Sequence, residues 1–227
     1  MSGFPACTAA LSAALILASC ASAPPPTMPR AAGAAPHPAI VLVSGCAGSP
    51  ARDAYAAQVL AGAGYVVESV PRGGACTPER LASSALLAAA RAATRADVDP
   101  TRVHLVGWAE GGAGVIAALG EAGHGIRSAA AVYPTCAQLG RVEIGAPLLL
   151  LLGEADTLAP APACEALAGG ADRADRVLAI RYGGAGHGFD IPPAFGFWRG
   201  EGARFEARMR DAALQDIRTF FGGDAKR

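Results

Sequence analysis

The stretch that decides the fold is Val106-Gly-Trp-Ala-Glu-Gly-Gly112. It ends an apolar run that begins at Arg102, and the small and apolar residues 113–119 after it have the pattern of a helix. A strand, a sharp turn between glycines and a helix form the nucleophile elbow, G-x-S-x-G, in which the turn lifts the central side chain above the sheet. Glycines are needed because the strand and helix backbones approach closely. The central residue here is Ala109, so the sequence predicts this frame without its reactive side chain.

Length and composition predict a single globular domain and exclude some partners. The chain has 227 residues, of which 52% are hydrophobic, enough to bury one sizeable core. Its 19 basic and 19 acidic residues cancel, and no basic stripe is present. We therefore expect no nucleic acid partner.

The N-terminal sequence has the pattern of an export signal. Residues 9–18 form an apolar run that is too short to span a bilayer and suits the core of a signal peptide. Leu17-Ala-Ser-Cys20 resembles a bacterial lipobox, in which Cys20 is lipidated and becomes the mature N-terminus. The first twenty residues contain no Lys or Arg, so an ordinary secretory signal or a misassigned start is the alternative. We expect residues 1–20 to be a lipoprotein-type signal peptide, the protein to lie in the bacterial cell envelope or periplasm, and the lipid to be its one membrane attachment.

Beyond the signal, strands and helices alternate. Residues 21–38 are rich in Pro and Ala and predict a flexible linker, and residues 39–222 form the domain. Short apolar runs predict strands at 39–43, 65–70, 102–108, 129–133, 147–153 and 177–182. Helical patterns fall at 52–61, 78–96, 113–119, 161–168 and 205–221, and Asp99-Pro100 is expected to break the chain before the elbow strand. This alternation predicts an α/β fold, a mostly parallel sheet with helices on both faces, with sites at the carboxyl ends of the strands.

The cysteines support export. Without Cys7 and Cys20, an even set of four remains, as expected of an oxidising compartment. Four cysteines allow three pairings. If each follows the end of a strand, sequence neighbours are also neighbours in space, which favours Cys46–Cys76 and Cys136–Cys164. The competing interpretation, a zinc site, lacks C-x-x-C or H-x-x-x-H spacing, so no metal is expected.

Two later segments complement the elbow. Asp156 follows the apolar run 148–152, and His187 lies in the glycine-rich segment 184–190 after the next strand. Elbow, acid and histidine in this order match the triad of α/β-hydrolases. In that triad the histidine takes the proton of the nucleophile, and the acid fixes its tautomer and stabilises the imidazolium.

These motifs resemble the dienelactone hydrolase family over about residues 39–221. The resemblance is carried by G-x-x-x-G-G at the elbow, L-G-E-x-D ending at Asp156, and G-A-G-H-G-F-D around His187. Ser44-Gly-Cys46, Arg72-Gly73 and the cysteines are similar to an exported branch of the family. The resemblance implies a compact, lidless, single-domain α/β-hydrolase that cleaves esters or lactones with a Cys or Ser nucleophile and needs no metal or cofactor.

The resemblance also assigns further residues. It places the oxyanion hole at the backbone N–H groups of Glu110 and Cys46. It also makes Arg72 and Ser44 candidates for substrate binding: Arg72 lies at the pocket rim, where it would bind a substrate carboxylate, and Ser44 stands where many relatives carry His. Arg72 and Glu110 have plainer interpretations: Arg72 could be solvated, and Glu110 could merely favour the helix N-terminus. Cys46 could instead be a free thiol directed at the site, with the disulfide to Cys76 as the favoured alternative.

Ala109 leaves the function open between several classes. The first is a hydrolase-fold protein that binds a small ester or carboxylate with weak or no hydrolysis. The second is an active hydrolase in which His187 activates a water, or in which Ser44 or reduced Cys46 attacks. Position 109 could also be altered in a true Ser or Cys enzyme, and a purely structural envelope protein is a further class.

Overall fold

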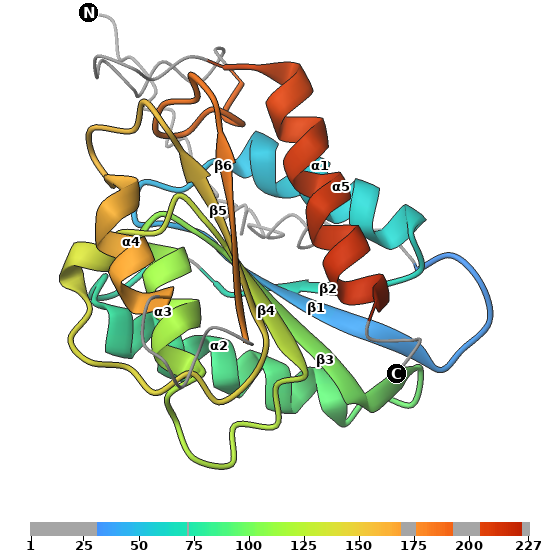
Figure 1. Cartoon of the computed structure of the whole chain (residues 1–227). Helices are drawn as coiled ribbons and strands as arrows, with labels where there is room; N and C mark the ends of the chain where they lie inside the picture. The colour runs from blue at the N-terminus through green and yellow to red at the C-terminus, as the bar shows by residue number, and fades with distance from the viewer. Residues whose placement is uncertain (1–30, 72, 169–175, 193–204, 224–227) are drawn as a thin grey trace, which may run out of the picture.

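A six-stranded parallel sheet forms the centre of the protein. The computed structural model describes residues 31–71, 73–168, 176–192 and 205–223. The strand order is β2-β1-β3-β4-β5-β6, and every pairing between neighbours is parallel (Figure 1). The strands are β1 (His37–Val43), β2 (Val66–Ser69), β3 (Val98–Trp108), β4 (Ser128–Val132), β5 (Leu148–Gly153) and β6 (Val177–Tyr182). The α/β fold expected from the sequence is confirmed.

Helices cover both faces of the sheet (Figure 1). They are α1 (Pro50–Gly62), α2 (Pro78–Ala93), α3 (Glu110–Ala118), α4 (Ala161–Ala168) and α5 (Ala207–Gly223), with a 3-10 turn, η1 (Cys136–Gln138). One buried cluster joins α1 and α5 to the face that carries Ile40 and Leu42, and the other joins α2, α3 and α4 to the face that carries Val41 and Val43. Alternate residues of β1 therefore enter opposite core layers, as a strand buried on both faces requires.

The order in which the strands are added along the sheet changes direction at β1. From β1 the chain passes to β2 at one edge and then returns to β3 on the other side of β1. The loops that follow the carboxyl ends of β1 and β3 therefore run in opposite directions away from each other. This switch point is where open α/β sheets form ligand crevices.

The first helix on each face begins at a side-chain cap followed by proline. The Ser49 hydroxyl accepts the N–H of Arg52 at 3.4 Å, and Pro50 opens α1. Thr77 and Pro78 do the same for α2. These residues satisfy N–H groups that a helix start leaves unpaired. They explain why α1 begins at Pro50, two residues before the expected start, and why α2 begins at Pro78 as expected.

Among the strands, the starts of β1 and β3 differ from the expected ones by more than one residue. The strand β1 begins at His37, whose N–H donates to the Asp97 carbonyl at 2.8 Å, so the end of the expected linker belongs to the sheet. The expected break at residues 99–100 is an irregularity inside β3, because Val98 pairs with His37 whereas Val103 already pairs with Ala39. A proline that lacks a ladder hydrogen bond is tolerated at such a position.

Several expectations concern residues outside the described ranges. The signal peptide with Cys20, most of the linker, and Arg72 lie there. Within the described ranges, none of the helices combines the length and apolar character that crossing a bilayer requires.

Two disulfides join the elements as expected. Cys46 pairs with Cys76, and Cys136 pairs with Cys164. Disulfides persist in oxidising compartments, so they indicate an extracellular or periplasmic protein.

Candidate functional site

The elbow turn holds Ala109 in a conformation that favours glycine. Ala109 separates β3 from α3 with φ 52° and ψ −120°. Its N–H donates to Val132 at 3.1 Å, and its carbonyl accepts from Ala113 at 3.1 Å and Thr135 at 3.2 Å. A positive φ costs a residue with a side chain about 1–3 kcal/mol, so these bonds must hold the turn in place.

The elbow glycines are required by close backbone contacts. A Cβ on Gly107 would lie 2.3 Å from the carbonyl oxygen of Gly111. A Cβ on Gly111 would lie 2.0 Å from the carbonyl oxygen of Val43 in β1. The start of α3 therefore packs directly on two strands, which fixes the turn at the switch point.

The acid and the histidine predicted from the sequence are in contact. Asp156 follows β5 and His187 follows β6, and His187 Nδ1 lies 2.8 Å from Asp156 Oδ2. Both side chains are buried. The other carboxylate oxygen of Asp156 accepts the N–H groups of Leu158 at 2.9 Å and Ala159 at 2.8 Å. Asp156 thus caps its own turn and orients the imidazole at the same time.

Ala109 and His187 line one small cavity. Its volume is about 20 Å³, which is room for about one water molecule. Glu110, Gly45 and Tyr133 are among its other lining residues. The Tyr133 ring packs against the imidazole with centroids 4.8 Å apart. The elbow, the histidine and, through the histidine, the acid therefore meet at one place on the carboxyl edge of the sheet.

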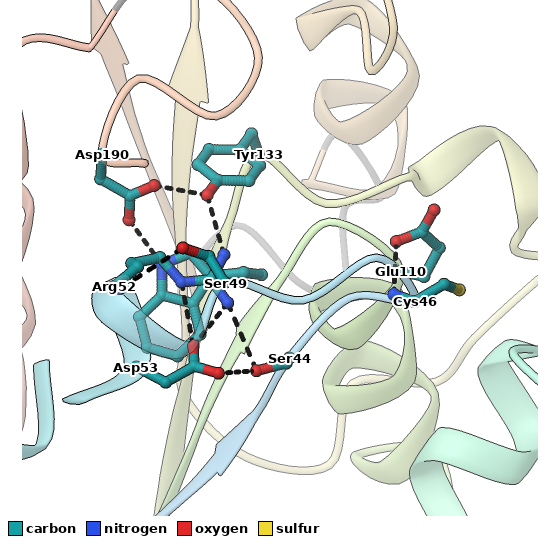
Figure 2. Close-up of polar contacts among 9 residues, drawn as sticks. Ser44, Cys46, Ser49, Arg52, Asp53, Glu110, Tyr133 and Asp190 are labelled. Carbon is teal, nitrogen blue, oxygen red and sulfur yellow. Dashed lines mark hydrogen bonds and ion pairs between the residues drawn. The ribbon is translucent and has the colours of Figure 1, made fainter. Parts of the chain in front are cut away.

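Glu110 and Cys46 face each other beside this cavity. The backbone N–H of Cys46 donates to Glu110 Oε2 at 3.2 Å (Figure 2). The Cys46 sulfur is bonded to Cys76, so the alternative of a free thiol is wrong.

A buried polar network, centred on Arg52, supports the same edge (Figure 2). The Arg52 guanidinium bonds Asp53 at 2.6 Å, Tyr133 at 3.2 Å and Ser44 at 3.3 Å. It also lies over the Trp108 ring, 4.5 Å from the centroid. These partners come from α1, the end of β4, the loop after β1 and the end of β3.

Asp190 closes the network three residues beyond His187. It accepts the Tyr133 hydroxyl and, at 2.8 Å, the indole N–H of Trp108. Burial raises the pKa of Asp190, and the charge of Arg52 opposes that shift. Burial alone would lower the pKa of Arg52, but interactions with Tyr133, Asp53 and Asp190 raise it, so the guanidinium stays charged. The loop that carries His187 is therefore tied to a fixed buried cation.

The network changes the interpretation of Ser44 and includes Trp108. The Ser44 hydroxyl, expected to contact substrate, donates to Asp53 and accepts from Arg52. Trp108 is buried and also holds Asp190 through its indole N–H. Arg52 and Tyr133 were not predicted from the sequence, because no motif marks them. The signal that existed was Asp190, the last residue of the histidine motif.

Among the described residues, no three His, Cys, Asp or Glu side chains lie together as metal ligands would.

A parallel sheet with an elbow after β3, an acid after β5 and a histidine after β6 defines the α/β-hydrolase class. The family model for the dienelactone hydrolase family matches residues 74–221, more than half of the chain. The chain belongs to the dienelactone hydrolase family. A search of curated protein sequences finds no match.

Solved structures show the same fold at low identity. A Klebsiella pneumoniae protein provisionally named a dienelactone hydrolase is 17% identical, with a TM-score of 0.65 over 85% of this chain and 90% of that one. Esterase 2 of Thermogutta terrifontis, phosphoramylated by tabun, is 19% identical, with a TM-score of 0.66 over 86% and 87%. A dienelactone hydrolase-like promiscuous phosphotriesterase from metagenomic libraries is 18% identical, with a TM-score of 0.66 over 84% and 88%.

Proposed function

We propose that this protein binds a small carboxylic ester or carboxylate at the elbow and hydrolyses esters weakly or not at all. The observation that supports this is the methyl group of Ala109, which shares a cavity with His187 while Asp156 holds the imidazole. The pair that would activate a nucleophile is present, and the residue at the position for attack has no reactive atom.

The size of the rate loss that follows from a missing nucleophile favours a binding function over catalytic turnover. In subtilisin, loss of the triad serine lowers kcat about 2 × 10⁶-fold, and the rate that remains is roughly 10³–10⁴-fold above that of water. Backbone donors such as the N–H groups of Glu110 and Cys46 would supply that remainder. Such a rate is far below that of an ordinary esterase.

A second candidate is a hydrolase in which His187 activates a water instead of a side chain. The cavity over Ala109 favours it, because its volume of about 20 Å³ suits a single water. Ser44 is a poor substitute nucleophile, since its hydroxyl is held by Asp53 and Arg52.

Turnover of a short-chain aryl ester separates the two. We expect the native chain to have almost no activity and Ala109→Ser to be active. Adding His187→Ala to Ala109→Ser should abolish that activity. Native turnover at ordinary esterase rates that disappears in His187→Ala would replace the first proposal with the second. Arg72 is proposed to bind a ligand carboxylate, which Arg72→Gln in a butyrate titration tests through a weaker Kd.

We further propose export to the bacterial envelope, with the signal peptide cleaved just before Cys20 and Cys20 lipidated, so that a lipid is the membrane attachment. Mass spectrometry of the mature N-terminus checks this: an acylated Cys20 supports it, and an unmodified N-terminus contradicts lipidation. Cys20→Ala should release the protein from membranes.

A further inference from the structure

The Glu110 side chain lies in the place that the proposed function assigns to a ligand oxygen. Its Oε2 accepts the Cys46 N–H at 3.2 Å, and Figure 2 shows the carboxylate directed from α3 toward the loop after β1. A Cβ on Gly45 would lie 2.6 Å from this oxygen and 3.1 Å from the Ala109 Cβ. The carboxylate therefore rests against Gly45, beside the elbow turn.

The Cys46 N–H lies in the loop that follows β1. The disulfide to Cys76 tethers the loop that presents it. With Glu110 in place, the donor points at a resident carboxylate. A ligand oxygen must first break this hydrogen bond.

We propose that Glu110 is an internal occupant of the oxyanion site, and that an external carboxylate binds by displacing it. The identity of the external ligand rests on the proposed function, whereas the internal contact does not. Glu110 then determines which ligands enter, because an ester carbonyl is a weaker acceptor than the carboxylate that it must replace.

The hydrogen bond between Glu110 and the Cys46 N–H is weak enough for a ligand to displace Glu110 readily. A donor-acceptor distance of 3.2 Å is at the long end of normal, and the contact is exposed. A hydrogen bond contributes a net free energy of about 1 kcal/mol, which favours the closed form, with Glu110 bound to the Cys46 N–H, about fivefold over the open form. Ligand affinity falls by the fraction of protein that is open, so truncation of Glu110 should raise it by about the same factor.

The adjoining hollow indicates the size of the ligand. Its volume is about 120 Å³, and Gly45, Cys46, Cys76, Arg80 and Leu81 are among its lining residues. A ligand oxygen at the Cys46 N–H could extend a short chain into this hollow, near the Arg80 side chain. We therefore infer a short-chain carboxylate.

Amide NMR on the full mature chain tests the proposal, with the Cys46 N–H as the probe. Glu110→Ala removes the occupant, and Glu110→Gln keeps an acceptor oxygen without the charge. Glu121→Ala is the matched control, because Glu121 is an exposed glutamate just beyond α3. We expect the Cys46 resonance to move in Glu110→Ala and to stay in place in Glu121→Ala. An unmoved resonance in Glu110→Ala would overturn the internal contact.

Titration with butyrate and with neutral butyramide then tests displacement. We expect both to bind Glu110→Ala about fivefold more tightly than the native chain and to shift the Cys46 resonance. A higher affinity for butyrate alone, equal in Glu110→Gln and Glu110→Ala, would show that Glu110 acts only by charge repulsion, and it would overturn the proposal that Glu110 occupies the oxyanion site. An affinity that does not change in Glu110→Ala would overturn the proposal as well. Ester turnover by the native chain would contradict the proposed function and leave the Cys46 readout unaffected, so the two failures are distinguishable.

Discussion

Ala109 and Tyr133 follow the ends of the neighbouring strands β3 and β4, and both have positive φ, 52° and 38°. Residues with side chains adopt this region only where surrounding contacts compensate for the cost. Here the compensation is visible: Ala109 is bound to Val132 and Thr135, and Tyr133 to Asp190 and Arg52. The strain is therefore concentrated beside His187, where the proposed site lies.

His104 is a second residue whose surroundings have a measurable consequence. It is buried in β3, its Nδ1 lies 2.9 Å from the Ser128 hydroxyl, and its ring stacks on Phe221. Burial, with smaller contributions from Arg102 and Arg127, lowers its pKa from 6.5 to about 3. The imidazole thus stays neutral in the folded protein well below the pH at which it is protonated in the unfolded chain.

This difference predicts acid sensitivity. Between pH 6.5 and about 3 the unfolded chain binds a proton that the folded protein rejects, so stability is lost as pH falls, by up to about 1.4 kcal/mol per pH unit from this residue. Urea unfolding at pH 7 and at about pH 5 should show a smaller loss in His104→Phe than in the native chain. Equal losses in the two proteins would contradict the assignment.

At the scale of elements, the elbow depends on contact between α3, β3 and β1. Gly111→Ala places a methyl 2.0 Å from the Val43 carbonyl oxygen, and backbone cannot move aside cheaply. Because this overpacks the contact, we expect the free energy of unfolding to fall by several kcal/mol, or the variant to fail to fold. Gly62→Ala is the matched control, because Gly62 ends α1 with open space around it. It should be neutral or stabilising by up to about 1 kcal/mol in thermal or urea unfolding. Similar effects at both positions would contradict the close-contact account.

Arg52 holds α1 to the loop that carries His187. Arg52→Leu leaves Asp190 and Tyr133 buried without their cation, which predicts a loss of about 3–5 kcal/mol. Arg95→Leu removes an exposed arginine paired with Glu68 and Asp97, and its effect should be much smaller. Urea unfolding of the two variants gives the comparison; an equal, small effect would show that the buried network contributes little.

At the scale of the whole molecule, one disulfide joins the loop after β1 to the segment before α2, and the other joins η1 to α4. They close segments of 30 and 28 residues, for which chain entropy predicts about 3.5 kcal/mol each. Paired Cys→Ser replacement of Cys136 and Cys164 should lower Tm, and thiol titration of the unreduced native protein should find none of the four cysteines free. Two free thiols among these four would contradict one of the bridges.

Much of the architecture could be predicted from local pattern. Glycines at 107, 111 and 112 mark the elbow because only they allow the contacts, and apolar runs mark strands that are buried on both faces. The Arg52 network could not be predicted, since Arg52 reads as an ordinary polar residue of α1 and its partners come from distant parts of the chain. The Glu110 contact depends on which way one side chain turns, which spacing does not encode.

The central claim is that position 109 is the site of nucleophilic attack in this fold and carries no nucleophile in this chain. Intact-protein mass spectrometry after exposure to a fluorophosphonate tests it most directly, because the reagent labels an activated serine covalently. We predict no adduct on the native chain, one adduct on Ala109→Ser, and loss of that adduct when His187→Ala is added. An adduct on the native chain, or an Ala109→Ser chain that stays unlabelled while folded, would contradict the claim.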